Sequence, residues 1–121
     1  MSDSISIKPD VTQPGASALE VDAQQATVAA VKATTGQIFG YHIYNPNTTI
    51  AYFHFYDIPS GSVTVGTSPR KITLAIPAGG GVDGVFPMPI TFTTAIAIAA
   101  TTTITGNTNP TTGLLVDIFY A

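Results

Sequence analysis

The sequence predicts an all-β domain, an antiparallel β-sandwich or jelly roll with an extended N-terminal arm. From residue 27 onward, short runs rich in Val, Ile, Thr, Tyr and Phe alternate with Gly, Pro, Asn and Ser, a pattern typical of strands separated by turns. No stretch after residue 31 shows the 3.6-residue period of a helix. The turns leave no room for long helical crossovers, which favours antiparallel pairing. At 121 residues, we expect one domain.

The first 26 residues are predicted to form the arm. They contain little hydrophobic periodicity, and they hold five of the eleven charged residues: Asp3, Lys8, Asp10, Glu20 and Asp22. A segment of this composition buries too little apolar surface to fold alone. We therefore divide the chain into an arm over residues 1–26 and a β-sandwich over residues 27–121. The alternative is that Ile5, Ile7 and Leu19 dock on the chain's own sheet.

The predicted strands then follow in order. They cover residues 27–33, 37–45, 50–57, 70–77, 91–103 and 114–120, with shorter strands near 63–65 and 82–86. The segment from Phe39 to Tyr56 carries seven aromatic residues and both histidines, and we interpret it as a hairpin. Successive strand residues point to opposite faces, so this hairpin would have rings on both sides. One side would line the core, and the other suits a subunit contact.

The scarcity of charge predicts an assembly. Only eleven of the 121 residues are charged, whereas 45% are hydrophobic. Soluble domains normally devote about a quarter of their residues to Asp, Glu, Lys and Arg. Apolar surface left open by such a composition favours association. We expect a homo-oligomer, most simply a trimer, with an interface made by Tyr52, Phe53, Phe55 and Ile98.

Composition also argues against several classes of function. A net charge of −3 with four cations gives no basic stripe, so direct binding to nucleic acid is not expected. The absence of cysteine excludes disulfide scaffolds and thiolate metal sites. The uncharged run over residues 84–116 is interrupted by Pro and Gly and is rich in Thr, which argues against a membrane span. The first residues lack the pattern of a secretory signal, so we expect synthesis and assembly in a cytoplasm.

No group of residues predicts catalysis. His42 and His54 are twelve positions apart, and neither has the spacing of a metal ligand pair. Asp57, Asp83 and Asp117 are isolated at predicted strand ends, and we interpret them as turn caps and solvated ends. Residues 77–81 are rich in glycine but lack the lysine and the helix of a phosphate loop. We predict no catalytic residue, no metal and no cofactor, and we do not expect an enzyme.

The order of the motifs resembles small structural proteins encoded by tailed bacteriophages. The resemblance covers about residues 37–121. It rests on Gly-Tyr-His-Ile-Tyr-Asn-Pro-Asn at 40–47, Ala-Tyr-Phe-His-Phe-Tyr-Asp at 51–57, Lys-Ile-Thr-Leu-Ala-Ile-Pro-Ala-Gly-Gly at 71–80, Phe92 followed by Ala-Ala-Thr-Thr-Thr at 99–103, and Val-Asp-Ile-Phe-Tyr at 116–120. These motifs are signatures of strands and turns. Where such proteins often have a glycine after a Phe-Ser-Thr stretch, this chain has Phe92-Thr93-Thr94-Ala95.

The resemblance implies a virion component without enzymatic activity. It implies a capsid cement or decoration protein that lies on the outer surface of the expanded head and bridges subunits of the major capsid protein. The arm would contact the capsid through Ile5, Ile7, Lys8 and Val11. Two alternatives stay open. One is a tail or fibre component, and the other is a carbohydrate-binding sandwich that stacks sugars on Tyr41, Tyr44, Tyr52 and Tyr56.

Overall fold

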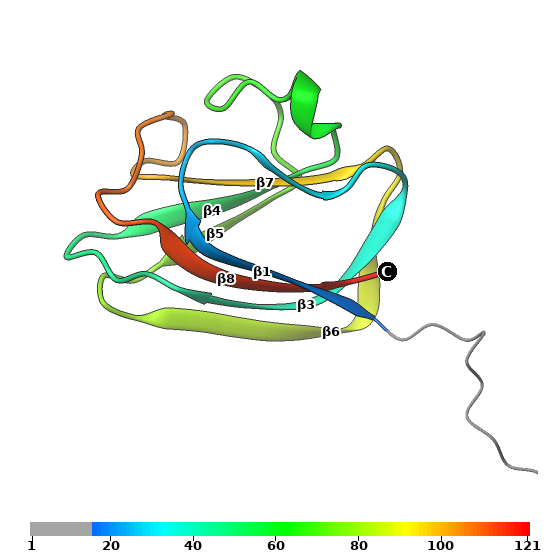
Figure 1. The fold of residues 1–121 in the computed structure, drawn as a ribbon, viewed down its shortest axis with the longest axis horizontal. Coiled ribbons are helices and arrows are strands. Elements are labelled where there is room, and N and C mark those ends of the chain that lie inside the picture. The colour runs from blue at the N-terminus through cyan, green and yellow to red at the C-terminus, as the bar shows by residue number, and fades with distance from the viewer. Residues whose placement is uncertain (1–15) are drawn as a thin grey trace, which may run out of the picture.

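The structure is a computed structural model that describes residues 16–121 (Figure 1). It contains eight β-strands and one short 3₁₀ helix. The strands are β1 (Ser17–Gln24), β2 (Ala29–Lys32), β3 (Gly36–Tyr44), β4 (Ala51–Tyr56), β5 (Ile72–Ile76), β6 (Gly81–Phe92), β7 (Ile96–Thr101) and β8 (Leu114–Tyr120). The 3₁₀ helix η1 (Ser60–Ser62) lies between β4 and β5.

Two four-stranded antiparallel sheets pack against each other (Figure 1). Sheet A has the strand order β1-β8-β3-β6, and sheet B has the order β2-β7-β4-β5. The pairing is nested, because β1 pairs with β8, β2 with β7, β3 with β6, and β4 with β5. The chain is therefore one long antiparallel ribbon folded over into two layers. The predicted all-β antiparallel sandwich is confirmed.

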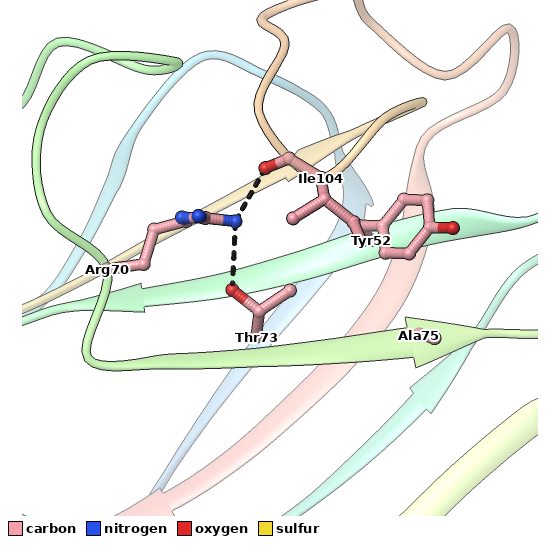
Figure 2. A pocket seen from close by; sticks show the side chains of 5 residues that line it. All are labelled: Tyr52, Arg70, Thr73, Ala75 and Ile104. Atoms are coloured by element: carbon pink, nitrogen blue, oxygen red, sulfur yellow. Dashed lines mark hydrogen bonds between the residues drawn. The ribbon is translucent and has the colours of Figure 1, made fainter.

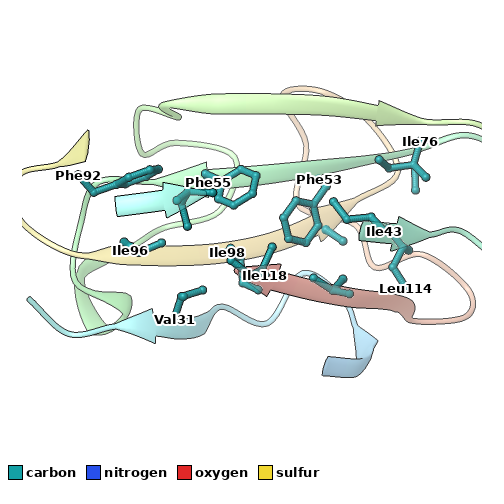
Figure 3. Close-up of a cluster of buried hydrophobic side chains, with 14 residues drawn as sticks. Val31, Ile43, Phe53, Phe55, Ile76, Phe92, Ile96, Ile98, Leu114 and Ile118 are labelled. Atoms are coloured by element: carbon teal, nitrogen blue, oxygen red, sulfur yellow. The ribbon is translucent and has the colours of Figure 1, made fainter. Parts of the chain in front are cut away.

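The hydrophobic core lies between the sheets (Figure 3). Alternate residues of each strand point inward, as in β8, where Leu114, Val116 and Ile118 are buried. From sheet B, Phe53 and Phe55 reach into the core, and their rings meet edge to face at 5.1 Å between centroids. Full burial of one such side chain contributes about 1.5–3 kcal/mol. These interlocking side chains hold the two sheets together.

The chain itself covers the outer side of sheet B. All six residues of β7 are buried, although only one side of the strand faces the core. On its other side, Ala97, Ala99 and the neighbouring Tyr56 pack against Val28, Ile58, Val63 and Val65. Most of this cover comes from the segment between β4 and β5, which carries η1 and passes over β7 (Figure 1). A strand that is apolar on both sides is thus buried within one chain.

The boundary predicted for the arm is wrong for residues 17–24. They form β1, which pairs with β8 over most of its length, and Leu19 and Val21 pack against the core. The alternative docking of Leu19 on its own sheet is therefore correct. Glu20 and Asp22 suggested an arm, but they are the outward residues of an amphipathic edge strand. Ile5 and Ile7, the other residues of that alternative, lie outside the described residues.

The predicted hairpin over Phe39–Tyr56 is also wrong. β3 pairs with β6 and β8 in sheet A, whereas β4 pairs with β5 and β7 in sheet B. The connection between them crosses from one sheet to the other, and two buried asparagines hold it. Asn45 Nδ2 donates to the carbonyls of Thr49 (2.9 Å) and Ile76 (3.2 Å), and Asn47 Nδ2 donates to the carbonyl of Thr112 (2.8 Å).

Three other predicted strands differ from the structure. The strand expected over 91–103 is split, because β6 ends at Phe92 and β7 begins at Ile96. The strand expected near 82–86 is the middle of the longer β6, and no strand forms at 63–65. Asp57 fixes the turn between β6 and β7 by accepting hydrogen bonds from the backbone N–H groups of Thr93, Thr94 and Ala95. These hydrogen bonds to Asp57, which is distant in the sequence, break the strand that was predicted over residues 91–103.

Candidate functional site

The solvent side of sheet A, which we call the A face, carries most of the exposed apolar side chains. Val85 is 82% exposed opposite Gly40, and Tyr44, Leu115 and Phe119 are exposed at outward positions of the neighbouring strands. Met88, also 82% exposed, lies at the β6 edge of the same sheet. In residues 16–121, only Ile50 and Ile104 are other large hydrophobic side chains of this exposure. Apolar groups concentrated in this way mark an interaction surface.

The edge strand β6 presents Met88 on a protrusion that follows the paired Val85. Gly40 lies opposite Val85 and Ile38 lies opposite Ile90, so residues 86–89 of β6 face the single residue Phe39 of β3. The surplus residues push the strand out of the ladder. Pro87 and Pro89 flank Met88 and restrict the backbone, and they offer no N–H group to a neighbouring strand. The protrusion therefore presents Met88 in a restricted conformation and disfavours edge-to-edge pairing at this point.

A row of ionisable side chains crosses the A face. The register places Glu20 opposite Asp117, Asp117 opposite His42, and His42 opposite Asp83. His42 Nδ1 lies 3.7 Å from Asp117 Oδ2. The interpretation of Asp83 and Asp117 as isolated ends is wrong, because both lie within strands and flank His42. In the described part of the chain, no three His, Asp or Glu side chains are placed to hold a metal ion.

Within residues 16–121, four of the five acids lie on sheet A, whereas Asp57 and all three cations lie with sheet B. Of the charged residues within 16–121, the acids on sheet A are Glu20, Asp22, Asp83 and Asp117. The three cations lie with sheet B, Lys32 in β2 and Arg70 and Lys71 just before β5. The A face is therefore both apolar and acidic. A partner of this face gains most from apolar groups surrounded by hydrogen-bond donors or cations.

Three of the four residues predicted for the oligomer interface are buried in the core of the single chain, where they cannot contact a second subunit. Phe53, Phe55 and Ile98 are at most 1% exposed and belong to the core of the single chain. Tyr52 is half-buried on the outer side of sheet B. The predicted capsid contacts Ile5, Ile7, Lys8 and Val11 lie outside the described residues. Sequence reasoning missed Leu115 and Phe119, although both alternate with the inward residues of β8 and so occupy its outward positions.

His54 lies on the outer side of sheet B and is buried. Its Nδ1 is 3.1 Å from Thr73 Oγ1 and its Nε2 is 2.7 Å from Thr101 Oγ1. Burial, assisted by the charge of Arg70, lowers the pKa of His54 to about 4. The imidazole is therefore neutral at physiological pH and has a hydroxyl partner at each nitrogen. Both ring nitrogens of His54 are thus satisfied by hydrogen bonds within the sheet.

Next to His54, an open pocket of ≈ 390 Å³ lies on sheet B (Figure 2). Five residues from β4, β5 and two loops line it: Tyr52, Arg70, Thr73, Ala75 and Ile104. Arg70 Nη1 donates to the carbonyl of Ile104 at 2.7 Å and lies 3.5 Å from Thr73 Oγ1. These contacts orient the guanidinium at one side of the pocket, and the ring of Tyr52 stands at the other side (Figure 2).

The four tyrosines proposed as a stacking platform do not share a surface. Tyr56 is fully buried, and Tyr41 packs against the core beside Phe86. Tyr44 is exposed on sheet A, whereas Tyr52 lines the pocket on sheet B. A platform of four rings is therefore excluded, because β3 and β4 belong to different sheets. Only Tyr52 remains beside a pocket.

Comparison of the chain with protein-family models and with curated proteins gives no match. Within residues 16–121, the structure has no helix of the length and apolarity needed to cross a bilayer.

Proposed function

We propose that the protein is a non-enzymatic structural component of a phage virion, a capsid cement protein that attaches through the A face. The observation that carries this proposal is the concentration of exposed apolar groups on sheet A, with Val85 and Met88 each 82% exposed. Interfaces derive most of their affinity from a few such groups that become fully desolvated. The phage-like order of motifs supplies the class of partner, the major capsid protein.

Two further features support a structural role. The nested pairing of eight strands in two sheets is the arrangement of a jelly roll, an architecture found in viral capsid proteins and in lectins. We therefore assign the sandwich to the jelly-roll class as part of this proposal. In addition, β1 is an edge strand of sheet A, so the chain enters the domain beside the A face. The predicted contacts Ile5, Ile7, Lys8 and Val11 precede β1 in the sequence.

The proposed mechanism is thermodynamic. A protein that binds the expanded capsid lattice, but not the unexpanded one, stabilises the expanded state by mass action. Many repeated contacts of modest strength then act together on one particle. The same apolar face would also serve the homo-oligomer, most simply a trimer, that the composition predicts. Self-association and capsid attachment would share the A face.

The test compares two sets of surface substitutions. The first set is Val85→Ser, Met88→Ser and Phe119→Ser together on the A face, and the control is Ile50→Ser, an exposed isoleucine in the β3–β4 loop. We expect the A-face variant to remain folded but to lose occupancy on purified virions, seen by cryo-electron microscopy. The temperature at which the particles release DNA should fall accordingly. The control should decorate virions like the unsubstituted protein.

Three outcomes would contradict parts of the proposal. Full occupancy of the A-face variant would exclude the A face as the attachment surface. Density found on the tail alone would replace the capsid assignment with the tail or fibre alternative. A monodisperse 12.5 kDa species in light scattering at micromolar concentration would exclude the oligomer. Deletion of residues 2–15, which leaves β1 intact, tests separately whether the N-terminal segment adds to attachment.

A further inference from the structure

We propose that the pocket on sheet B binds an acidic monosaccharide unit, with Arg70 holding the carboxylate and Tyr52 stacking against the sugar ring. This site is independent of the A face, because it lies on the outer side of the other sheet. Its volume of ≈ 390 Å³ falls within the range of small-molecule sites, about 300–1,000 Å³.

The charge of the pocket selects an anion. Within residues 16–121 the only close pair of opposite charges is His42 with Asp117, so no carboxylate of the described chain neutralises Arg70. Its Nη1 is used by the Ile104 carbonyl and Thr73, and in the described part of the chain its other nitrogens make no hydrogen bond. A guanidinium presents five N–H donors in a planar fork that matches a carboxylate. The remaining donors can therefore take both oxygens of one carboxylate.

Neighbouring groups do not compete for that anion. Both ring nitrogens of His54 are hydrogen-bonded, one to Thr73 and the other to Thr101, and the imidazole is neutral at physiological pH. Lys71, the next residue along the chain, places its Nζ over the ring of Phe92, 5.3 Å from the centroid. Arg70 is thus the single cation of the pocket, and its contacts with Ile104 and Thr73 orient it before a ligand arrives. Such preorganisation reduces the entropy lost on binding.

The shape of the pocket favours a flat body attached to the carboxylate. Tyr52 and Ala75 are direct cross-strand partners, and the small side chain of Ala75 leaves space beside the tyrosine ring. The side chain of Ile104 lies between that ring and Arg70 (Figure 2). An aromatic face packs well against the C–H face of a pyranose, and the tyrosine hydroxyl stays available for hydrogen bonding. Thr73 Oγ1 and the second lone pair of the Ile104 carbonyl can bond sugar hydroxyls. An acidic side chain of a peptide would satisfy Arg70 but would leave the Tyr52 side of the pocket empty.

The experiment is a titration of the full-length protein with three probes, glucuronic acid, glucose and acetate, followed by amide chemical shifts. We expect glucuronic acid to bind with a Kd on the order of 1 mM, as befits one charged contact and one stacking contact at an open site. Glucose lacks the carboxylate and acetate lacks the ring, so each should bind about tenfold more weakly. The shifts should cluster at Tyr52, Thr73 and Ala75.

Three variants and one control locate the site. Arg70→Gln removes the charge, Tyr52→Ala removes the ring, and Ala75→Leu fills the space while Arg70 is retained. Each substitution should raise the Kd for glucuronic acid about tenfold or more. Lys71→Gln, which removes the adjacent cation outside the pocket, should leave the affinity unchanged. Unfolding curves of all four proteins check that the fold is retained.

The results that overturn the inference are distinct. Equal binding of glucose and glucuronic acid would exclude the role of Arg70, and equal binding of acetate would reduce the pocket to a simple anion site. Tighter binding of an acetylated glutamate amide would indicate a peptide ligand instead. No shift with any probe would exclude the site. Because the A face is intact in these variants, their attachment to virions should be normal, so failure here is separable from failure of the cement role.

Discussion

Sheets A and B meet their surroundings differently although both contain four antiparallel strands. The outer side of sheet B is partly covered by the segment between β4 and β5, which buries Tyr56, Ala97 and Ala99. The outer side of sheet A has no such cover within residues 16–121, and Val85, Met88 and Phe119 remain exposed. Apolar composition alone therefore does not reveal an interface, because the chain covers one apolar face with its own loop. The face that stays open is the one that we propose for attachment.

The charged residues follow the same division. The acids of sheet A lie in the open, with Asp117 and Asp83 flanking His42. On the sheet B side, Asp57 and His54 have hydrogen-bond partners inside the chain. Chemically identical side chains thus serve the fold on one sheet and remain available to a partner on the other. Three matched pairs of substitutions test this comparison.

The largest effect is expected for phenylalanine. Phe53→Ala removes a ring that is fully buried between the sheets, and we expect a loss of about 3–5 kcal/mol in the free energy of unfolding. Phe119→Ala truncates a ring that is 38% exposed on the A face, and it should cost about 1 kcal/mol or less in the isolated chain. Urea unfolding followed by near-UV circular dichroism measures both. Both are measured at a dilution at which the proposed oligomer is dissociated, because self-association through the A face would bury Phe119. Equal losses at that dilution would contradict the exposed position of Phe119.

The histidines should differ in their response to pH. The pKa of His54 is lowered to about 4 in the folded state from an ordinary value of 6.5. Between these values the unfolded chain binds the proton and the folded chain does not, so stability falls as pH decreases from 6.5 to 4 and then levels off with respect to this group. Allowing for solvent screening, the loss is about 2 kcal/mol.

Substitution of each histidine isolates this effect. His54→Gln should remove the slope between pH 6.5 and 4, and it should cost about 1–3 kcal/mol at neutral pH because two hydroxyls lose a well-placed partner. His42→Gln, on the exposed A face, should leave the stability at neutral pH near that of the unsubstituted protein. Urea unfolding at a series of pH values measures the difference. A slope that survives His54→Gln would assign it to another group.

The sequence allowed the fold class to be predicted, because strand composition and turn residues are local properties. It also placed β3, β4, β5 and β8 to within about two residues, the usual uncertainty of strand ends. The errors arose where a distant residue decides the outcome. Asp57 ends β6 and starts β7 through its bonds to Thr93 and Ala95, and nothing local in that threonine-rich run indicates the break.

The site was harder to predict than the fold. Phe53 and Ile98 were assigned to an interface because a doubly apolar strand was expected to need a second subunit. The loop that covers sheet B was not foreseen, since Ile58, Val63 and Val65 lie in a stretch rich in Gly, Ser and Pro. The row from Glu20 to Asp83 depends on the register of four strands, which a sequence does not specify. The pocket combines Tyr52, Arg70 and Ile104, which only the tertiary structure brings together.

The smallest effect is expected for the aspartates. Burial alone would raise the pKa of Asp57, but the N–H groups of Thr93, Thr94 and Ala95 and the hydroxyl of Thr93 hold it below its ordinary value. In Asp57→Asn an amide Nδ2 would face those donors, so we expect a loss of about 1–2 kcal/mol at neutral pH. Asp117→Asn on the A face should change stability by about 0.5 kcal/mol or less, because the side chain is partly exposed and makes one long contact to His42.

The stability of Asp57→Asn and Asp117→Asn at acid pH distinguishes the roles of the two aspartates. A carboxylate whose pKa is lower in the folded state than in the unfolded state stabilises the fold at pH values above its unfolded-state pKa. That stabilisation is lost as the pH falls through the folded-state pKa. The advantage of the unsubstituted protein over Asp57→Asn should therefore shrink below about pH 4. Urea midpoints across the acid range measure both. If Asp117→Asn proves the more destabilising variant, the acidic row of the A face contributes to the fold rather than remaining free for a partner.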